Sequence, residues 1–200
     1  MTGNSNNYAQ VSNQAVRFGY SSALRNILTG IFGVSLFIGL TYIGSLIRIP
    51  LQPVPITLQT MFVLLAGAVL GARRGSFSQA VYIAIGAFGV PIFAGHAAGL
   101  ATLGGPTGGY IVAFMVAPIL IGGLIRRSQS LLWQAAVFSL GSILILGIGM
   151  VHLTLLYTHN PATSLMVGVV PFIPGELFKI AAATSIYRSY TALGRYRTRS

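Results

Sequence analysis

The order of hydrophobic and polar residues along the chain predicts helices that cross a membrane. Long apolar stretches alternate with short segments rich in Gly, Pro, Ser and Arg. A helix needs about 20 apolar residues to cross the hydrocarbon core of a bilayer. We therefore predict an all-α membrane protein, a six-transmembrane-helix bundle. Its spans are placed at residues 27–47, 57–72, 76–93, 109–125, 131–157 and 174–193.

The first 22 residues have a different composition, because they are polar and rich in Asn, Ser and Gln. They lack the basic segment, short apolar stretch and small-residue cleavage site of a signal peptide. We predict a flexible polar tail over residues 1–22, with at most one helical turn before the membrane. Residues 23–200 are predicted to form one transmembrane substrate-binding domain.

Composition and charge support this interpretation. Hydrophobic residues make up 54% of the chain and charged residues only 6%, whereas soluble domains carry about 25% charged residues. In a soluble protein the net charge of +11 would suggest nucleic acid. Here basic residues that flank apolar spans explain it, so no nucleic-acid partner is expected. Cysteine is absent and the three histidines are scattered, so neither a thiol nucleophile nor a metal site is expected.

Basic residues also predict the orientation, since cytoplasmic loops carry an excess of Lys and Arg. With the amino terminus inside, ten of the twelve basic residues lie on the cytoplasmic side: Arg17, Arg25, Arg73, Arg74, Arg126, Arg127, Arg188, Arg195, Arg197 and Arg199. Arg48 then lies in an outer loop and Lys179 within the last span. We predict a multi-pass protein of the inner (plasma) membrane with both termini in the cytoplasm.

The predicted loops differ between the two sides of the membrane. The inner connections at residues 72–75 and 126–130 are short, whereas the outer ones at 50–56, 94–109 and 158–173 are long. Long ordered loops are usually functional, which favours a pocket open to the outside with lids above it. The alternative, that outer loops are long because no partner constrains them, stays open.

Glu176 is the single acidic residue of the sequence, and it lies three residues before Lys179, the single lysine. Pro174 is a helix-start signal, so both residues belong to the first turns of the last span and share one helix face. Ionisable groups within a membrane are costly and by default indicate function. The pair offers an acceptor for N–H groups and a cation for an oxygen or carboxylate. The alternative is a structural ion pair at the positive end of the helix dipole.

Two further segments carry candidate binding residues. The run 104–110 contains Gly108, Gly109 and Tyr110, where glycines would let a ligand approach the backbone or would only allow tight helix packing. It is no phosphate-binding P-loop, because Tyr110 occupies the position that requires Lys. In the run 53–60, Thr57 is a plausible N-cap, and Gln59 places an amide near the outer pocket. We expect His152 to be hydrogen-bonded and structural.

Five motifs in order resemble the BioY family, the biotin-specific substrate-binding components of energy-coupling-factor transporters. The resemblance covers about residues 49–179. The motifs are PVPITLQ (53–59), LGARRG (70–75), GVPIFAG (89–95), GPTGGY (105–110) and PFIPGELFK (171–179).

The resemblance implies a six-helix bundle that binds biotin with high affinity from outside, is not an enzyme and needs no cofactor. It implies a transmembrane coupling protein and two cytoplasmic ATPases as partners. The lipid bilayer is a further partner that the composition predicts, and a homo-oligomer stays open. The family's binding positions fall on Glu176, Lys179, Gly108, Gly109 and Tyr110. Some relatives carry a polar Asn where this chain has Gly95, and the family's usual Asp is replaced by Glu176.

Other functions stay open at this point. An ion- or proton-coupled permease or channel would need a polar path through the membrane and usually shows internal repeats. A membrane enzyme would need more than one carboxylate beside one lysine, and no catalytic residue is proposed. A structural subunit would not need the Glu176–Lys179 pair. Docking residues for the coupling protein are not assigned, although Thr29, Gly33, Ser35 and Gly39 form small-xxx-small spacings in the first span.

Overall fold

The computed structural model describes the backbone of residues 4–197 and the side chains of residues 24–193. The chain forms two compact units, Met1–Gly33 and Val34–Ser200. The first helix, α1 (Asn4–Leu46), begins in the first unit and ends in the second. The predicted division into a tail over 1–22 and a domain over 23–200 stays a prediction.

The first unit is helical from Asn4 onward. Residues 4–22, expected to hold at most one helical turn, are therefore helical throughout, and their flexibility stays a prediction. Pro is absent from this segment, and extension of a helix from the apolar segment that follows costs less than nucleation of a new helix. In that apolar segment Leu28, Ile31 and Phe32 are more than half exposed, as expected for side chains that contact lipid.

The second unit is a helical bundle with short elements at its connections. Its long helices besides the end of α1 are α2 (Gln59–Leu70), α3 (Ala72–Ala87), α5 (Gly108–Leu124), α6 (Leu131–Leu153) and α8 (Ile173–Arg197). The short elements are β1 (Arg48–Ile49), β2 (Ile56–Thr57), η1 (Ala94–His96), α4 (Leu100–Gly104), η2 (Ile125–Arg127), the π-helical turn η3 (Thr154–Thr158), α7 (Pro161–Gly168) and η4 (Val170–Phe172).

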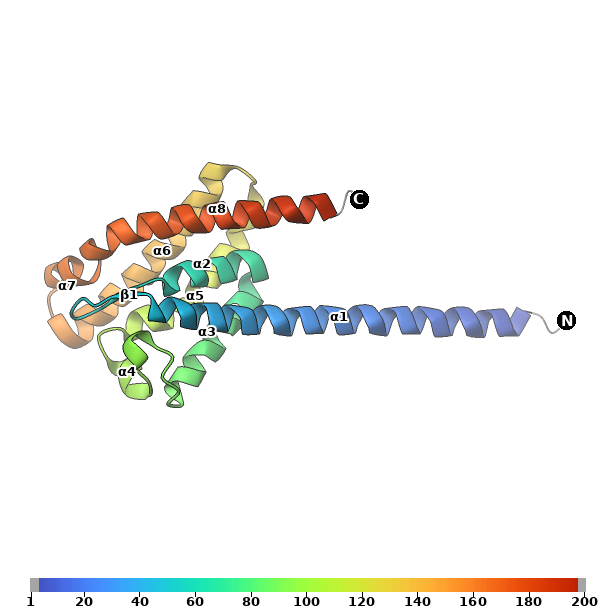
Figure 1. Ribbon diagram of the computed structural model, residues 1–200, viewed down its shortest axis with the longest axis horizontal. Coiled ribbons are helices and arrows are strands. Elements are labelled where there is room, and N and C mark those ends of the chain that lie inside the picture. Colours follow the sequence, from blue (N-terminus) through green and yellow to red (C-terminus); the bar gives the residue numbers. More distant parts are fainter. Residues whose placement is uncertain (1–3, 198–200) are drawn as a thin grey trace. The chain divides into compact units, whose positions relative to one another are not determined.

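Within this unit α5 packs against α2, α3 and α6, while α8 packs against α2 and α6 (Figure 1). The antiparallel β1–β2 hairpin, α4 and α7 gather at one end of the bundle, on the left of Figure 1. The turn between α2 and α3 and the start of α6 lie toward the other end of the bundle. The elements that the sequence places outside the membrane thus share one end of the bundle.

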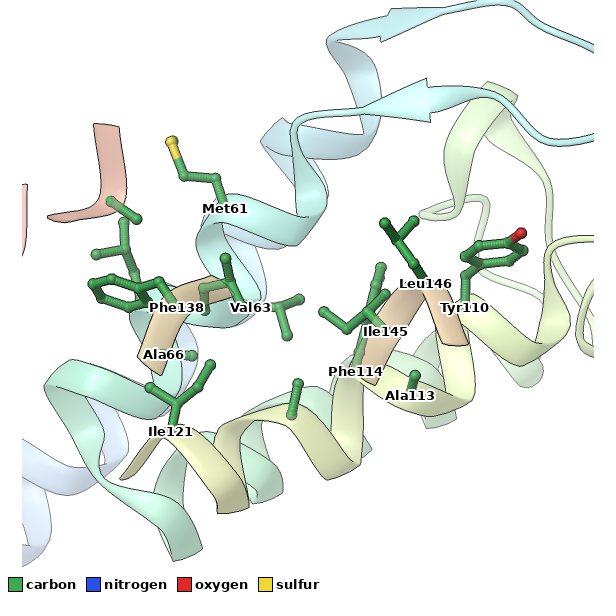
Figure 2. Packing of buried hydrophobic residues seen from close by; sticks show 14 of the residues in the cluster. Met61, Val63, Ala66, Tyr110, Ala113, Phe114, Ile121, Phe138, Ile145 and Leu146 are labelled. Atoms are coloured by element: carbon green, nitrogen blue, oxygen red, sulfur yellow. The ribbon is translucent and has the colours of Figure 1, made fainter. Parts of the chain in front are cut away.

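The core of the second unit is formed by apolar side chains of the long helices. Figure 2 shows Phe114 of α5 beside Ile145 of α6, with Tyr110 and Leu146 further along the same two helices. Small residues let these helices approach closely. A Cβ atom on Gly67 of α2 would lie 2.7 Å from the Cα of Pro118, so the contact between α2 and α5 requires glycine there.

Four segments of the described chain are long and apolar enough to cross a membrane: Leu24–Leu46, Gly108–Arg127, Leu131–Thr158 and Pro161–Leu193. The first three coincide approximately with the first, fourth and fifth predicted spans, and the last contains the sixth, 174–193, together with α7 and η4. The second and third predicted spans correspond to α2, with 12 residues, and α3, with 16. Both are short for a span, so helix length alone does not confirm the count of six.

The connections contain more regular structure than the sequence predicts. The outer segment 158–173 includes α7, whose N-cap Asn160 accepts hydrogen bonds from Ala162 N and Thr163 N. Thr57 is not an N-cap, because it belongs to β2 and α2 begins after Leu58 without a side-chain cap. Glu176 lies in the first turn of α8, as predicted.

Candidate ligand-binding site

A cavity of about 190 Å³ lies where the outer elements meet α2, α5, α6 and α8. That volume is many times what one water molecule needs. Most of its lining is apolar or aromatic, including Phe93, Phe114, Ile145 and Phe172. Few polar groups within an apolar lining are typical of a small-molecule site.

The polar end of this cavity is a network around the predicted Glu176–Lys179 pair. Both side chains are buried, and Lys179 Nζ lies 2.5 Å from Glu176 Oε1. The Thr60 hydroxyl donates to Glu176 Oε1 over 3.0 Å and accepts from Lys179 Nζ over 2.8 Å. The Ser142 hydroxyl donates to Glu176 Oε2 over 2.6 Å. Each buried charge thus has a charged partner and neutral hydrogen-bond partners, as buried charges require.

The network presents a cation to the cavity. Lys179 and Thr60 line it, whereas Glu176 lies behind them and outside the lining. An ammonium group has three N–H donors, and two of those of Lys179 are used by Thr60 and Glu176. Among the described residues Lys179 is the one charged side chain in the lining. The arrangement can therefore donate a hydrogen bond to a ligand oxygen.

Tyr110 forms part of the cavity wall and is fixed by three contacts. Its ring stacks on Phe172, with centroids 6.0 Å apart and planes 12° apart. Its hydroxyl donates to the carbonyl oxygen of Gly168 over 2.8 Å, which connects α5 to the end of α7. A side chain on Gly149 would overlap the ring, so α6 leaves room for the aromatic group only because glycine stands there.

Gln59 also lines the cavity, and it connects three elements. Its Nε2 donates to the Tyr82 hydroxyl over 2.7 Å, and its Oε1 accepts from the Thr57 hydroxyl over 3.0 Å. Tyr82 in turn donates to the carbonyl oxygen of Ile92 over 2.6 Å. This chain of hydrogen bonds holds β2 and the loop after α3 against α2, next to the cavity.

The three predicted glycines lie near the cavity without lining it. A side chain on Gly108 would overlap the carbonyl oxygen of Leu103, and one on Gly109 would overlap His152. Both glycines therefore allow close packing at the start of α5. Gly95 has a positive φ of 77°, and a Cβ there would lie 2.6 Å from a guanidinium nitrogen of Arg48.

Side chains of α6 and η3 hold the glycine-rich loop in place. His152 Nε2 lies 3.0 Å from the carbonyl oxygen of Gly105, and the Tyr157 hydroxyl donates to that of Gly104 over 2.5 Å. The prediction that His152 is hydrogen-bonded is confirmed. The loop 94–109 is thus tied to α6, next to the cavity wall that Thr102, Thr107 and Tyr110 supply.

Sequence reasoning did not find Thr60 and Ser142, although both bind Glu176. Their positions along the chain gave no signal, because a hydroxyl that follows Gln59 or lies within an apolar span is common. A usable signal was the lone acid itself: a buried carboxylate needs several donors, so hydroxyls on neighbouring spans are its natural partners.

The fold and the cavity define an integral membrane protein with a binding site for a small molecule. A family model described as the BioY family matches residues 13–195. The "Biotin transporter BioY" of Thermotoga maritima is 39% identical over 76% of this chain and 89% of that protein. The "Probable biotin transporter BioY" of Pyrococcus horikoshii is 41% identical over 76% and 90%.

A solved structure agrees with these relatives. The crystal structure of "the S-component for biotin from an ECF-type ABC transporter" superposes with a TM-score of 0.79 at 29% identity, covering 84% of this chain and 93% of the other. The chain belongs to the BioY family.

Proposed function

We propose that this chain captures biotin from outside the cell with high affinity and imports it as the S component of an ECF-type transporter. The observation that carries the proposal is the cavity lined by Lys179, which has one N–H donor left after its bonds to Thr60 and Glu176. Relatives named as biotin transporters and the biotin S-component structure support it. They favour this function over an ion- or proton-coupled permease or channel, and over an enzyme.

The chemistry of biotin suits the cavity. Biotin has a ureido ring with two N–H donors and one carbonyl, an apolar thioether ring and a carboxylate on an aliphatic arm. Lys179 would donate to the ureido oxygen, and the aromatic lining would cover the rings. The carboxylate is the less suitable partner, because it would lie beside Glu176, and like charges in one buried site repel. Glu176 would position Lys179, and Gln59 and Tyr110 would hold the walls.

In this proposal the three predicted glycines have structural roles, because they allow close packing beside the cavity. Gly108 and Gly109 let α5 begin close to α6, which places Tyr110 at the cavity. Gly95 lets the loop after α3 pass beside Arg48, so that Ala94 and Ala97 line the cavity.

Binding of biotin to the purified protein, measured by calorimetry with thiamine and riboflavin as controls, tests the function. The double variant Glu176→Gln, Lys179→Met tests the site, because it removes both charges together and leaves neither unpaired. Hydrogen bonds to charged groups contribute about 1.5–3 kcal/mol each, so we expect affinity to fall at least about a hundredfold. A folded double variant within about threefold of wild type would show that the site lies elsewhere.

Two biotin analogues test which end of biotin contacts Lys179. Iminobiotin carries a protonatable imino nitrogen in place of the ureido oxygen, and biotin amide lacks the charged carboxylate. If Lys179 meets the ureido oxygen, iminobiotin should bind about a hundredfold more weakly than biotin, since it loses an acceptor and gains a like charge. Biotin amide should bind within about tenfold of biotin. The reverse order would place the carboxylate at Lys179.

The proposed membrane arrangement has six spans, formed by α1, α2, α3, α5, α6 and α8, with both termini in the cytoplasm. The bias of basic residues supports it. The natural chain has no cysteine, so single cysteines at Ser5 and at the exposed Thr163 can be labelled on intact cells with an impermeant reagent. Labelling at Thr163 alone is expected, whereas labelling at Ser5 alone would reverse the orientation.

The proposed partners are a transmembrane coupling protein and two cytoplasmic ATPases. The similarity to an S component of an ECF-type ABC transporter supports this assignment. Reconstitution tests it: we expect ATP-dependent biotin uptake into vesicles only when the coupling protein and the ATPases accompany this chain. Uptake driven by ATP with this chain alone would contradict the proposal.

A further inference from the structure

A second cavity lies at the end of the second unit opposite the ligand site, between the start of α6 and the last turns of α8. It measures about 110 Å³. Its lining consists of Gln129, Gln134, Arg188, Thr191 and Ala192. None of these residues takes part in the ligand site, so the cavity needs an explanation of its own.

Gln134 is the unusual member of this lining. Its side chain is 1% exposed. In the part of the chain that the structure describes, its Oε1 is the one buried side-chain nitrogen or oxygen without a hydrogen-bond partner. Buried polar atoms are nearly always paired, and a buried amide oxygen that has lost water without gaining a donor lowers stability. No described residue donates to this oxygen, and an N–H or O–H donor of a bound molecule would satisfy it.

Arg188 brings a positive charge to the same cavity. Its guanidinium donates to the backbone oxygen of Gln129 over 3.4 Å, a long hydrogen bond. A guanidinium has five N–H donors in a planar fork that matches phosphate oxygens. Glu176, the single acidic residue of the sequence, is paired with Lys179 and Thr60 beside the other cavity. The guanidinium can therefore bind an anion without competition from a carboxylate side chain.

The position of the cavity in the membrane follows from its neighbours. Leu132 on α6 is 82% exposed and Leu193 on α8 is 70% exposed, so apolar surface reaches the level of the cavity. The polar turn with Arg126 and Arg127 comes directly before α6. Phe138, one turn beyond Gln134 on α6, and Tyr187, directly before Arg188 on α8, pack edge to face with centroids 6.1 Å apart. A cavity between exposed apolar side chains and an arginine-bearing turn fits the level of lipid headgroups.

We propose that this cavity binds the headgroup of a phospholipid that combines a phosphate with an N–H or O–H donor, such as phosphatidylethanolamine. The phosphate meets Arg188, and the ammonium or hydroxyl of the headgroup donates to Gln134 Oε1. Basic pockets between transmembrane helices bind the phosphates of anionic lipid headgroups, and Arg188 offers the same kind of phosphate contact here. Choline headgroups carry the phosphate but no N–H, so the Gln134 oxygen discriminates against them.

Fluorescence of Trp133 tests the proposal, because it is the single tryptophan of the chain and lies next to Gln134. The full-length protein is reconstituted in brominated phosphatidylcholine, which quenches tryptophan, and unbrominated lipids then compete. We expect phosphatidylethanolamine to relieve quenching at a mole fraction about three- to tenfold lower than phosphatidylcholine does, as one hydrogen bond predicts. Both lipids are zwitterionic, so overall charge does not confound the comparison.

Three variants test whether the preference for phosphatidylethanolamine arises from this cavity. Gln134→Met keeps the volume but removes the acceptor, so the preference for ethanolamine should disappear. Arg188→Gln should reduce the quenching of Trp133 by brominated phosphatidylcholine before any competitor is added, because the phosphate contact is lost. The matched control Arg127→Gln, an arginine outside the cavity lining, should behave as wild type. Thermal melting shows whether each variant is folded, and the test does not depend on biotin.

Adding soluble glycerophosphoethanolamine to protein in phosphate-free detergent separates the lipid from a free phosphate ester. A shift of Trp133 emission with the lipid but not with the soluble compound is expected. An equal response to both would overturn the assignment to a lipid. Equal relief by ethanolamine and choline lipids in wild type, or a preference that survives in Gln134→Met, would overturn the site itself.

Discussion

The two cavities lie at opposite ends of the α6–α8 pair, and their polar groups are paired in different ways. At the ligand site Glu176 accepts hydrogen bonds from Thr60, Ser142 and Lys179, all from within the chain. At the second cavity Gln134 Oε1 has no partner among the described residues. The buried charges of the ligand site are paired by side chains of the chain itself, whereas the amide oxygen of the second cavity lacks a donor among the described residues.

The two ends differ in how they compensate the free-energy cost of burying polar groups. A buried ion pair is stable only when its partners stay in place, because removing one leaves the other charged and unpaired. An unpaired neutral amide costs less and can be kept where a ligand provides the donor. Substitutions should therefore have opposite effects on stability at the two ends.

The largest effect is expected from breaking the ion pair on one side only. Lys179→Met leaves the Glu176 carboxylate buried without its cation, which should lower the free energy of unfolding by about 3 kcal/mol. The double variant with Glu176→Gln should lose clearly less, because no unpaired charge remains. Unfolding in mixed micelles with sodium dodecyl sulfate measures both, and a double variant as unstable as Lys179→Met would contradict this account of the network.

The next effect concerns Thr60, which binds both members of the pair. Thr60→Val keeps the shape but removes the donor to Glu176 and the acceptor for Lys179. We expect biotin affinity to fall about tenfold or more, because hydrogen bonds to charged groups contribute about 1.5–3 kcal/mol. Ser142→Ala is the matched control, since Ser142 binds the Glu176 oxygen that does not contact Lys179. It should reduce affinity less than Thr60→Val in the same calorimetric titration.

A smaller effect is expected at the wall of the ligand cavity. Tyr110→Phe keeps the ring on Phe172 but removes the hydrogen bond to Gly168 at the end of α7. A neutral hydrogen bond contributes about 0.5–1.5 kcal/mol, so biotin should dissociate about two- to tenfold faster in stopped-flow competition. If α7 does not help to close the cavity, the dissociation rate will stay at the wild-type value.

The sequence predicts the charged part of the ligand site better than the hydroxyl groups that support it. Glu176 and Lys179 could be singled out because charges in an apolar chain are costly. Thr60 and Ser142 could not, since their partner Glu176 lies 116 and 34 residues away along the chain. Such contacts follow from helix packing, which residue spacing within one segment does not reveal.

The same contrast holds for the fold. Long apolar runs predict α5, α6 and α8 well, because their length satisfies the bilayer requirement. The apolar pattern does not predict α7, because its eight residues are too few to show a helical period, although Asn160 followed by Pro161 is a helix-start signal. Pairing of β1 with β2 needs the hairpin geometry around the Pro-rich segment, which its composition does not predict.

The smallest and most discriminating effect is expected at the second cavity. Gln134→Met replaces an unpaired amide with an apolar side chain of similar size, and such exchanges are neutral or stabilising when a buried polar group has no partner. In detergent without phosphatidylethanolamine we expect the free energy of unfolding to rise by up to about 1 kcal/mol, with biotin affinity unchanged. Adding phosphatidylethanolamine should stabilise wild type more than the variant. The difference between their free energies of unfolding should therefore become smaller. A variant that is less stable than wild type without lipid would mean that Gln134 already has a partner, and the contrast between the two ends would not hold.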